Sequence, residues 1–186
     1  MEKTLIILRG LPGAGKSTLT KKLESDHGVE AVVCCADDYF YYGKEKIPEN
    51  YNWDGEKLFA AHKSSLQKCE DAIEEGKELI ISDNTNIHLR DLKPYAEMAK
   101  ESGYKIEVHS IVGMSAEESA KFNTHNVPLD VCVKILKKYN PCPNNLIRKD
   151  QTIEVTNVIH DYMGIRKGVF GNGKFNKKDK KKSKKI

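Results

Sequence analysis

The sequence predicts an α/β fold in which helices cover both faces of a parallel sheet. Three observations support this prediction. Short apolar runs alternate with longer segments of helical periodicity, a glycine-rich loop follows the first apolar run, and acidic residues follow the next two runs. With 186 residues, the chain has the size of one domain that can bury a core of its own.

In the first half of the chain, strands and helices alternate. We expect a strand at about residues 3–9, a helix from the glycine-rich loop to about 25, a strand at about 30–36, a helix at about 54–75 and a strand at 78–82. The strands are expected where apolar residues are consecutive. The helix at 54–75 has an apolar stripe at helical spacing, with Asp54 as its N-cap and Gly76 as its C-cap.

The second half adds a pair of helices between two strands. We expect a helix at about 89–102, a strand at 104–112, helices beginning at 115 and 128, a loop at 140–150 and a last strand at 152–159. Ser115 and Glu118 have the spacing of a capping box, and Pro128 is favoured in the first turn of a helix. Because crossovers between parallel strands are right-handed, all strand ends should share one edge, where ligands of such sheets bind.

The loop after the first strand carries the most specific motif. Residues 10–18 read G-L-P-G-A-G-K-S-T, the Walker A pattern between a strand and a helix. Its glycines let successive backbone N–H groups point at one anion, and the N-terminus of the helix adds a positive field. Lys16 supplies a mobile charge for the outer phosphates, and the Ser17 hydroxyl is placed to bind Mg²⁺. The expected contacts of the nucleotide are Gly10, Leu11, Pro12, Gly13, Ala14, Gly15, Lys16, Ser17 and Thr18.

Acidic residues follow the second and third strands. Asp83 comes directly after an apolar strand, which is the Walker B arrangement of a carboxylate that holds Mg²⁺. Asp37 and Asp38 end the second strand, and in phosphoryl transfer to a hydroxyl such a carboxylate accepts the proton of the acceptor. The alternative for Asp37 is a cap of the turn before Tyr39. Because the strand ends share one edge, these carboxylates should face the phosphate loop.

In combination, these motifs resemble those of the polynucleotide-kinase-like P-loop proteins. That family includes polynucleotide 5′-kinases and kinase-like domains of NEDD4-binding proteins. The matching segments after the Walker A motif are A-D-D-Y-F at 36–40, A-H at 61–62, S-D-N-T-N at 82–86, K-P-Y at 93–95 and N-T-H-N-V-P at 123–128. The resemblance covers about residues 3–140. It implies a P-loop kinase-type sheet with a helical lid at about 114–138.

The resemblance also implies roles for the matched residues. Lys16 and Ser17 would bind the phosphates and Mg²⁺, Asp83 would support the metal, and Asp37 would be the general base. His125 would be either a lid residue near the nucleotide or a cap that holds the turn of the lid. The residues expected to bind or shape the acceptor are Asp38, Tyr39, Asn84, Thr85 and Asn86.

Two residues depart from the family pattern. Phe40 stands where 5′-kinases usually carry an arginine that contacts the phosphate of the acceptor strand, and Phe122 stands where the lid usually carries an arginine for the γ-phosphate. Lys121 is the expected catalytic substitute in the lid, although a lysine lacks the planar fork of an arginine. Residues 39–42 and Trp53 are aromatic, and they could either stack on acceptor bases or pack in the core.

The net charge of +4 is concentrated at the C-terminus. Residues 174–186 hold eight lysines and one aspartate, so residues 1–173 carry −3. We therefore expect a domain at 1–170 and a disordered basic tail at 171–186. The tail is interpreted as a solubilising end, a nucleic-acid-binding arm or a nuclear localisation signal.

The composition favours a cytoplasmic or nuclear protein. Five cysteines without Cys-x-x-Cys spacing predict reduced thiols and no structural zinc. No apolar run has the length of a membrane span, and no secretory leader is expected. The first hypothesis is an ATP- and Mg²⁺-dependent kinase that phosphorylates the 5′-hydroxyl of RNA or DNA, with nucleic acid as its partner. The alternatives are a kinase for a nucleoside or other small metabolite, and a nucleotide-binding adaptor with little turnover.

Overall fold

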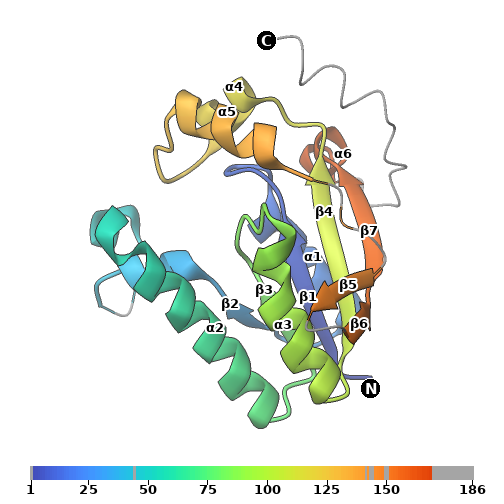
Figure 1. Cartoon of the computed structure of the whole chain (residues 1–186). Coiled ribbons are helices and arrows are strands. Elements are labelled where there is room, and N and C mark those ends of the chain that lie inside the picture. Colours follow the sequence, from blue (N-terminus) through green and yellow to red (C-terminus); the bar gives the residue numbers. More distant parts are fainter. Residues whose placement is uncertain (1, 44, 141, 143–144, 149–150, 169–186) are drawn as a thin grey trace.

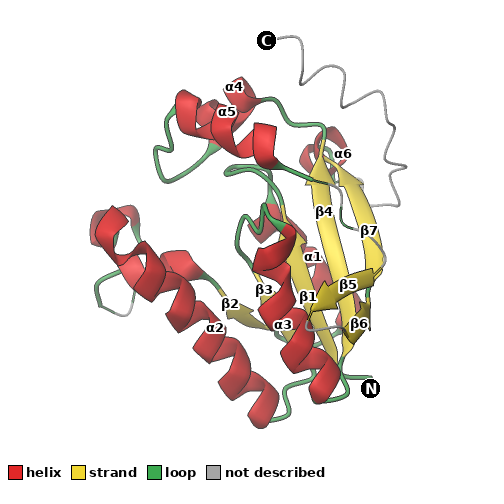
Figure 2. Ribbon diagram, viewed as in Figure 1, coloured by secondary structure: helices red, strands yellow, loops and turns green. Residues whose placement is uncertain are grey.

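A five-stranded parallel sheet is the framework of the protein (Figures 1 and 2). The computed structural model of the chain describes residues 2–43, 45–140, 142, 145–148 and 151–168. In sheet order the strands are β2 (Val32–Cys34), β3 (Leu79–Ser82), β1 (Thr4–Arg9), β4 (Lys105–Val112) and β7 (Thr156–Asp161). Every neighbouring pair is parallel, so the C-terminal ends of the strands meet at one edge. The predicted sheet is confirmed.

Helices cover both faces of this sheet, as the consecutive apolar residues of the strands require. On one face, α2 (Leu58–Glu74) and α3 (Leu89–Glu101) pack on Leu5 and Ile7 of β1. On the other face, α1 (Lys16–His27) and α6 (Tyr162–Arg166) pack on Ile6 and Leu8. Successive side chains of a strand point to opposite faces, so β1 contributes to both core clusters and is buried along its whole length.

A helical hairpin lies over the strand ends and forms the lid (Figure 1). It consists of α4 (Ala116–Phe122) and α5 (Leu129–Lys138). The capping box at the start of α4 is present, because the Glu118 amide donates to Ser115 Oγ (3.1 Å) and the Ser115 amide donates to the Glu118 carboxylate (2.9 Å). The lid therefore begins at the residue that the sequence pattern indicates.

The segment after the lid differs from the sequence prediction. The expected loop at 140–150 contains a strand, β5 (Asn145–Arg148), which pairs antiparallel with β6 (Gln151–Glu154). The strand expected at 152–159 is divided between β6 and β7. Prolines and asparagines dominate this segment, but Leu146, Ile153 and Val155 are buried in the α2–α3 core cluster. Tertiary packing of these three side chains therefore outweighs the local turn signals.

The remaining elements are short. Three 3₁₀ helices, η1 (Ala36–Phe40), η2 (Pro48–Asn50) and η3 (Gly55–Lys57), lie between β2 and α2. The second strand is shorter than the predicted 30–36 because η1 begins at Ala36. Among the described helices, none is long and apolar enough to cross a membrane. The predicted basic tail at 171–186 lies outside the described residues.

Candidate active site

The phosphate loop follows β1 and leads into α1. Its glycines are needed for conformation, because Gly13 (φ 74°) and Gly15 (φ 91°) adopt the left-handed region. Lys16 Nζ donates hydrogen bonds to the carbonyls of Gly10 (3.4 Å) and Leu11 (3.2 Å). Burial lowers the pKa of Lys16, and the negative charge of Asp83 opposes this shift. The lysine thus lies inside the loop, beside the carboxylate at the end of β3.

Ser17 and Asp83 bring a hydroxyl and a carboxylate together at the edge of the sheet. The Ser17 hydroxyl donates to Asp83 Oδ2 at 3.5 Å. Burial raises the pKa of Asp83, while Lys16 lowers it. Mg²⁺ is commonly held by one or two protein oxygens together with phosphates and water. This pair of oxygens fits such an ion, so Ser17 and Asp83 are the residues that would hold it.

Asp37 lies in η1, just after β2, and two aromatic side chains flank its carboxylate. The hydroxyl of Tyr51 donates to Oδ1 (3.1 Å), and Nε2 of His125 in the lid lies 3.6 Å from Oδ2. The rings of Tyr51 and His125 are themselves 4.4 Å apart. Burial and the neighbouring charge of Asp37 raise the pKa of Tyr51. Tyr51 was not expected at the site, because no sequence motif marks it.

Asp38 has different partners from Asp37. Its carboxylate is half-buried and lies 2.6 Å from Lys46 Nζ and 3.5 Å from Lys68 Nζ. The two neighbouring aspartates therefore belong to different environments. Of these two described aspartates, Asp37 is the one that contacts the lid, through His125.

The segment after β3, residues 84–86, holds the neighbouring strand ends in place by hydrogen bonds. Asn84 is buried and binds the backbone of the preceding strand end, accepting from the Ala36 amide at 2.8 Å. Asn86 is also buried, has a positive φ of 44° and donates to the Leu8 carbonyl at 2.8 Å. The Thr85 carbonyl accepts from the Gly10 amide at 3.2 Å. These bonds tie the ends of β1, β2 and β3 to one another.

The lid is in contact with the phosphate loop. Ser119 Oγ in α4 donates to the carbonyl of Pro12 at 2.7 Å. A Cβ atom at Gly13 would lie 2.7 Å from the backbone nitrogen of Asn123, so no side chain fits there. The end of α4 thus rests on the loop that is expected to hold the phosphates.

Two cations lie against Phe122, the residue that replaces the lid arginine. Lys121 Nζ is 5.4 Å from the centre of the Phe122 ring, and the guanidinium carbon of Arg166 is 4.2 Å from it. Arg166 ends α6, whose Ile165 lies against Gly15. The sequence gives no signal for Arg166, because α6 has five residues and no periodic pattern. Its place beside the lid is decided by the packing of α6.

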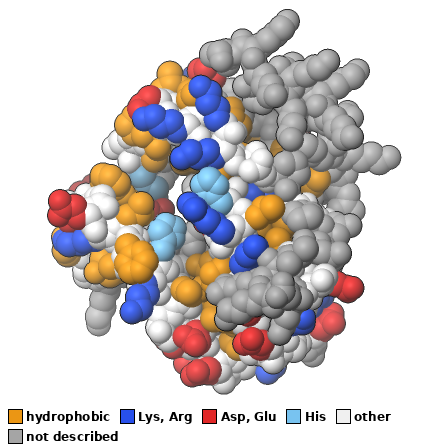
Figure 3. Space-filling view, viewed as in Figure 1, with side chains coloured by type: hydrophobic (Ala, Val, Ile, Leu, Met, Phe, Trp, Pro, Cys, Tyr) orange, Lys and Arg blue, Asp and Glu red, His pale blue; other side chains and the backbone are white. Residues whose placement is uncertain are grey.

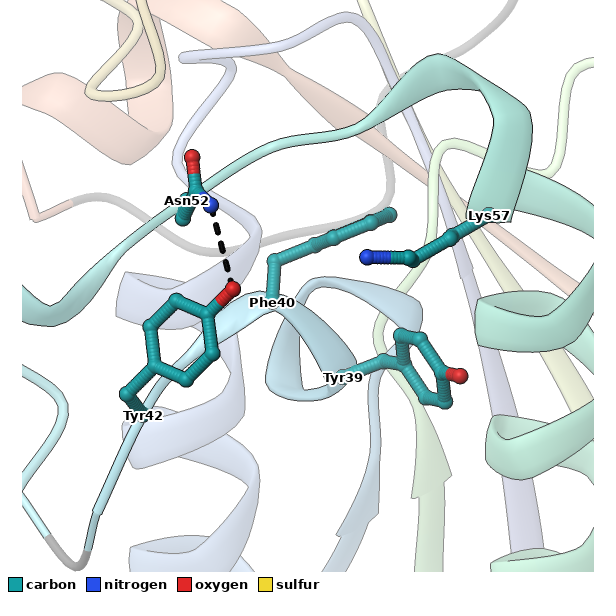
Figure 4. Close-up of a pocket in the computed structure, with 5 residues that line it drawn as sticks. All are labelled: Tyr39, Phe40, Tyr42, Asn52 and Lys57. Carbon is teal, nitrogen blue, oxygen red and sulfur yellow. Dashed lines mark hydrogen bonds between the residues drawn. The ribbon is translucent and has the colours of Figure 1, made fainter.

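An aromatic hollow of about 230 Å³ lies next to η1 (Figure 4). Its lining residues are Tyr39, Phe40, Tyr42, Asn52 and Lys57. Phe40 is 3% exposed and packs against Ala36 and Ala61, so it is a core residue at the wall of this hollow. Tyr39 and Tyr42 are 44% and 59% exposed, and Trp53 is 58% exposed. Most of the aromatic segment therefore faces outward.

Fold and site together define a P-loop domain of the kinase type. The sequence model of the AAA_33 family, described as an AAA domain, matches residues 5–122, and the chain belongs to this family. A gluconokinase from Sinorhizobium meliloti 1021 has a similar fold, with a TM-score of 0.53, 13% identity and coverage of 90% of this chain and 89% of that one. A chain of the PezAT toxin–antitoxin system of Streptococcus pneumoniae has a TM-score of 0.50, 14% identity and coverage of 97% and 81%.

Two human proteins contain segments similar to this chain. NEDD4-binding protein 2 of Homo sapiens is 33% identical over 138 residues, which are 73% of this chain and 8% of that protein. YLP motif-containing protein 1 of Homo sapiens is 25% identical over 169 residues, which are 80% of this chain and 8% of that protein. The chain thus corresponds to a small part of each of these relatives.

Proposed function

We propose that this protein is an ATP- and Mg²⁺-dependent kinase that transfers the γ-phosphate to a hydroxyl, namely the 5′-hydroxyl of RNA or DNA. The observation that carries the proposal is the meeting of Asp37 and Asp83 at the phosphate loop. The charges of both carboxylates act on Lys16, and Asp83 contacts Ser17. One carboxylate is thus available to hold the metal and the other to accept the proton of the acceptor hydroxyl. Phosphoryl transfer to a hydroxyl requires both of these roles.

Each residue has a distinct part in this reaction. The phosphate loop and Lys16 hold the β- and γ-phosphates, while Ser17 and Asp83 are the residues that would hold Mg²⁺, which would supply positive charge to these phosphates. Asp37 accepts the proton of the acceptor hydroxyl as its oxygen bonds to the γ-phosphorus and the bond to the β-phosphate breaks. Lys121 is the proposed cation of the lid. The acceptor approaches from the side of η1, where Asp38, Tyr39 and Thr85 lie.

The surface around this side supports a nucleic acid as the acceptor. The exposed rings of Tyr39 and Tyr42, in and just after the 3₁₀ helix that carries Asp37, offer faces on which bases can stack (Figure 4). Figure 3 shows Lys, Arg and His side chains around the recess between α2, α3 and the lid. The exposed or half-buried basic residues of these helices are His62, Lys63, Lys68, Arg90, Lys93, Lys100, Lys121, Lys134, Lys137 and Lys138. Such a rim attracts the phosphates of a strand.

A second function, a kinase for a nucleoside or other small metabolite, is favoured by one observation. Phe40, at the position of the arginine that contacts the strand in 5′-kinases, is buried in a cluster with Ala36 and Ala61. It therefore offers no charged group to an acceptor phosphate. The hollow beside it is lined by rings and by Asn52 and Lys57, a mixture that also suits a small polar acceptor.

The test is a transfer assay with γ-labelled ATP and Mg²⁺. The acceptors are 5′-hydroxyl RNA and DNA oligonucleotides and, in parallel, a panel of nucleosides. We expect label on an oligonucleotide with the wild type. Asp37→Asn should lower transfer by about 100-fold or more while ATP affinity stays near wild type, and Lys16→Ala should lose ATP binding.

Other outcomes would change the assignment. Label on nucleosides alone would select the small-metabolite kinase. Binding of ATP with no labelled product on any acceptor would contradict the kinase and leave a nucleotide-binding adaptor. Transfer by Asp37→Asn at the wild-type rate would show that Asp37 is not the base.

A further inference from the structure

We propose that His125 is a positioning residue that couples closure of the lid to the orientation of the base, Asp37. This inference rests on the proposed function, since it concerns the same reaction. Its starting point is the contact between His125 Nε2 in the lid and Asp37 Oδ2 in η1, 3.6 Å apart. These residues are 88 positions apart in the chain, so only the docking of the lid brings them together.

A local role for His125 in the turn of the lid is already filled by another side chain. Asn123 Oδ1 accepts from the Val127 amide at 2.7 Å, and Asn123 Nδ2 donates to the carbonyls of Ser119, Ala120 and Val127. Asn126 supplies the positive φ of 53° that the turn needs. The His125 side chain is thus free of the turn, and it extends to Asp37 instead.

Tyr51 and His125 lie on the two oxygens of the Asp37 carboxylate. Tyr51 donates to Oδ1 at 3.1 Å, His125 approaches Oδ2, and the two rings lie 4.4 Å apart. A carboxylate has about four lone-pair directions, so one direction of Oδ2 remains for the acceptor hydroxyl. The distance of 3.6 Å exceeds a hydrogen bond, and catalytic hydrogen bonds often shorten only when the substrates are bound.

The lid also contacts the other substrate site. Ser119 donates to Pro12 in the phosphate loop, and the backbone of Asn123 lies against Gly13. Phosphates in this loop therefore influence the same hairpin that carries His125. Through this hairpin, the base would be held in its productive orientation only when the lid is seated on the nucleotide. This arrangement would disfavour the hydrolysis of ATP while the lid is open.

The first experiment compares three variants of the full chain in the transfer assay. His125→Phe keeps a ring against Tyr51 but has no donor, His125→Gln keeps a donor, and Thr124→Ala is the matched control in the same turn. We expect His125→Phe to lower kcat by about 10- to 100-fold with the KM for ATP within about twofold, since small errors in orientation are costly. His125→Gln should recover most of this loss, and Thr124→Ala should have none.

Two results of this experiment would overturn the proposal. One is a wild-type kcat for His125→Phe accompanied by a higher KM for ATP, which would make His125 a nucleotide contact. The other is a His125→Gln variant as slow as His125→Phe, because then a donor to Asp37 is not what the reaction needs.

The second experiment does not depend on activity, so it separates this inference from the proposed function. The imidazole resonances of His125 are compared by NMR in the wild type, Asp37→Asn and Asp38→Asn. We expect them to shift in Asp37→Asn and to stay in place in Asp38→Asn, whose carboxylate pairs with Lys46 and Lys68. Equal effects of the two substitutions, or none from either, would refute the contact even in a protein that transfers no phosphate.

Discussion

At the scale of single residues, the site consists of polar groups whose neighbours prepare them for different tasks. Asp83 is half-buried beside Lys16, and this burial raises the pKa of its carboxyl group. Asp37 is more exposed, and its carboxylate lies between the Tyr51 hydroxyl and the His125 ring. The same residue type can therefore serve a metal at one strand end and an acceptor hydroxyl at the next, because the surroundings differ.

The raised pKa of Asp83 predicts a pH dependence of Mg²⁺ binding. A carboxyl group with a raised pKa keeps its proton to a higher pH than usual, so protons compete with Mg²⁺ as the pH falls. We expect the Mg²⁺ concentration for half-maximal ATP binding to rise when the pH is lowered from 7.5 to 5. Calorimetric titration at both pH values measures it.

Asp83→Asn is the control for this effect. The variant should require more Mg²⁺ at pH 7.5 and should show a smaller change between the two pH values. A variant whose pH dependence equals that of the wild type would mean that another group titrates.

At the scale of elements, the lid hairpin contacts both the phosphate loop and η1. α4 and α5 are short, with seven and ten residues, and isolated helices of that length are marginal in water. The connection between them is therefore stabilised by side chains, chiefly Asn123. Contact with the phosphate loop through Ser119 then fixes the hairpin on the body of the domain.

Substitution of Asn123 by alanine should loosen the lid without unfolding the domain. The side chain accepts one hydrogen bond in the turn and shares its two N–H donors among three carbonyls, and a full hydrogen bond contributes about 1 kcal/mol. We expect faster hydrogen exchange of amides in 116–138, with amides of β1 unchanged. Thr124→Ala is the control, and equal protection of the lid in Asn123→Ala and the wild type would contradict this role.

At the scale of the whole molecule, a buried polar chain joins β4 to β7 at the side of the sheet. His109 lies 2.8 Å from Glu107 and 3.0 Å from His160, and both histidines are buried. Nε2 of His109 faces the Glu107 carboxylate, and Nδ1 of His109 faces Nε2 of His160. Burial, with His109 as the second cause, lowers the pKa of His160 to about 4. The bond from His109 is the main cause that lowers the pKa of Glu107 to about 2.

The lowered pKa of His160 predicts that the protein loses stability in mild acid. His160 binds a proton in the unfolded chain near pH 6.5 but in the folded protein only near pH 4, so stability falls as the pH drops through that window. Between pH 7.5 and 5, His160 should account for about 2 kcal/mol of lost unfolding free energy. Urea unfolding at both pH values measures the loss.

His160→Gln removes the titrating group and serves as the comparison. Between the two pH values, the unfolding free energy of this variant should fall by about 2 kcal/mol less than that of the wild type. A variant that loses as much stability as the wild type would exclude His160 as the source.

The sequence alone determined the parallel sheet, the phosphate loop and the helix that begins after Ser115, because each depends on local patterns: apolar runs, a glycine spacing and a capping box. The resemblance to P-loop kinases added that this helix belongs to a lid. The sequence also indicated that Asp37 and Asp83 share one edge, since strand direction dictates where strand ends meet. The β5–β6 hairpin, α6 with Arg166, and the contacts of Tyr51 and His125 with Asp37 were decided by tertiary structure. In these features, residues far apart in the sequence come into contact because short segments pack together. Such contacts cannot be predicted from local periodicity.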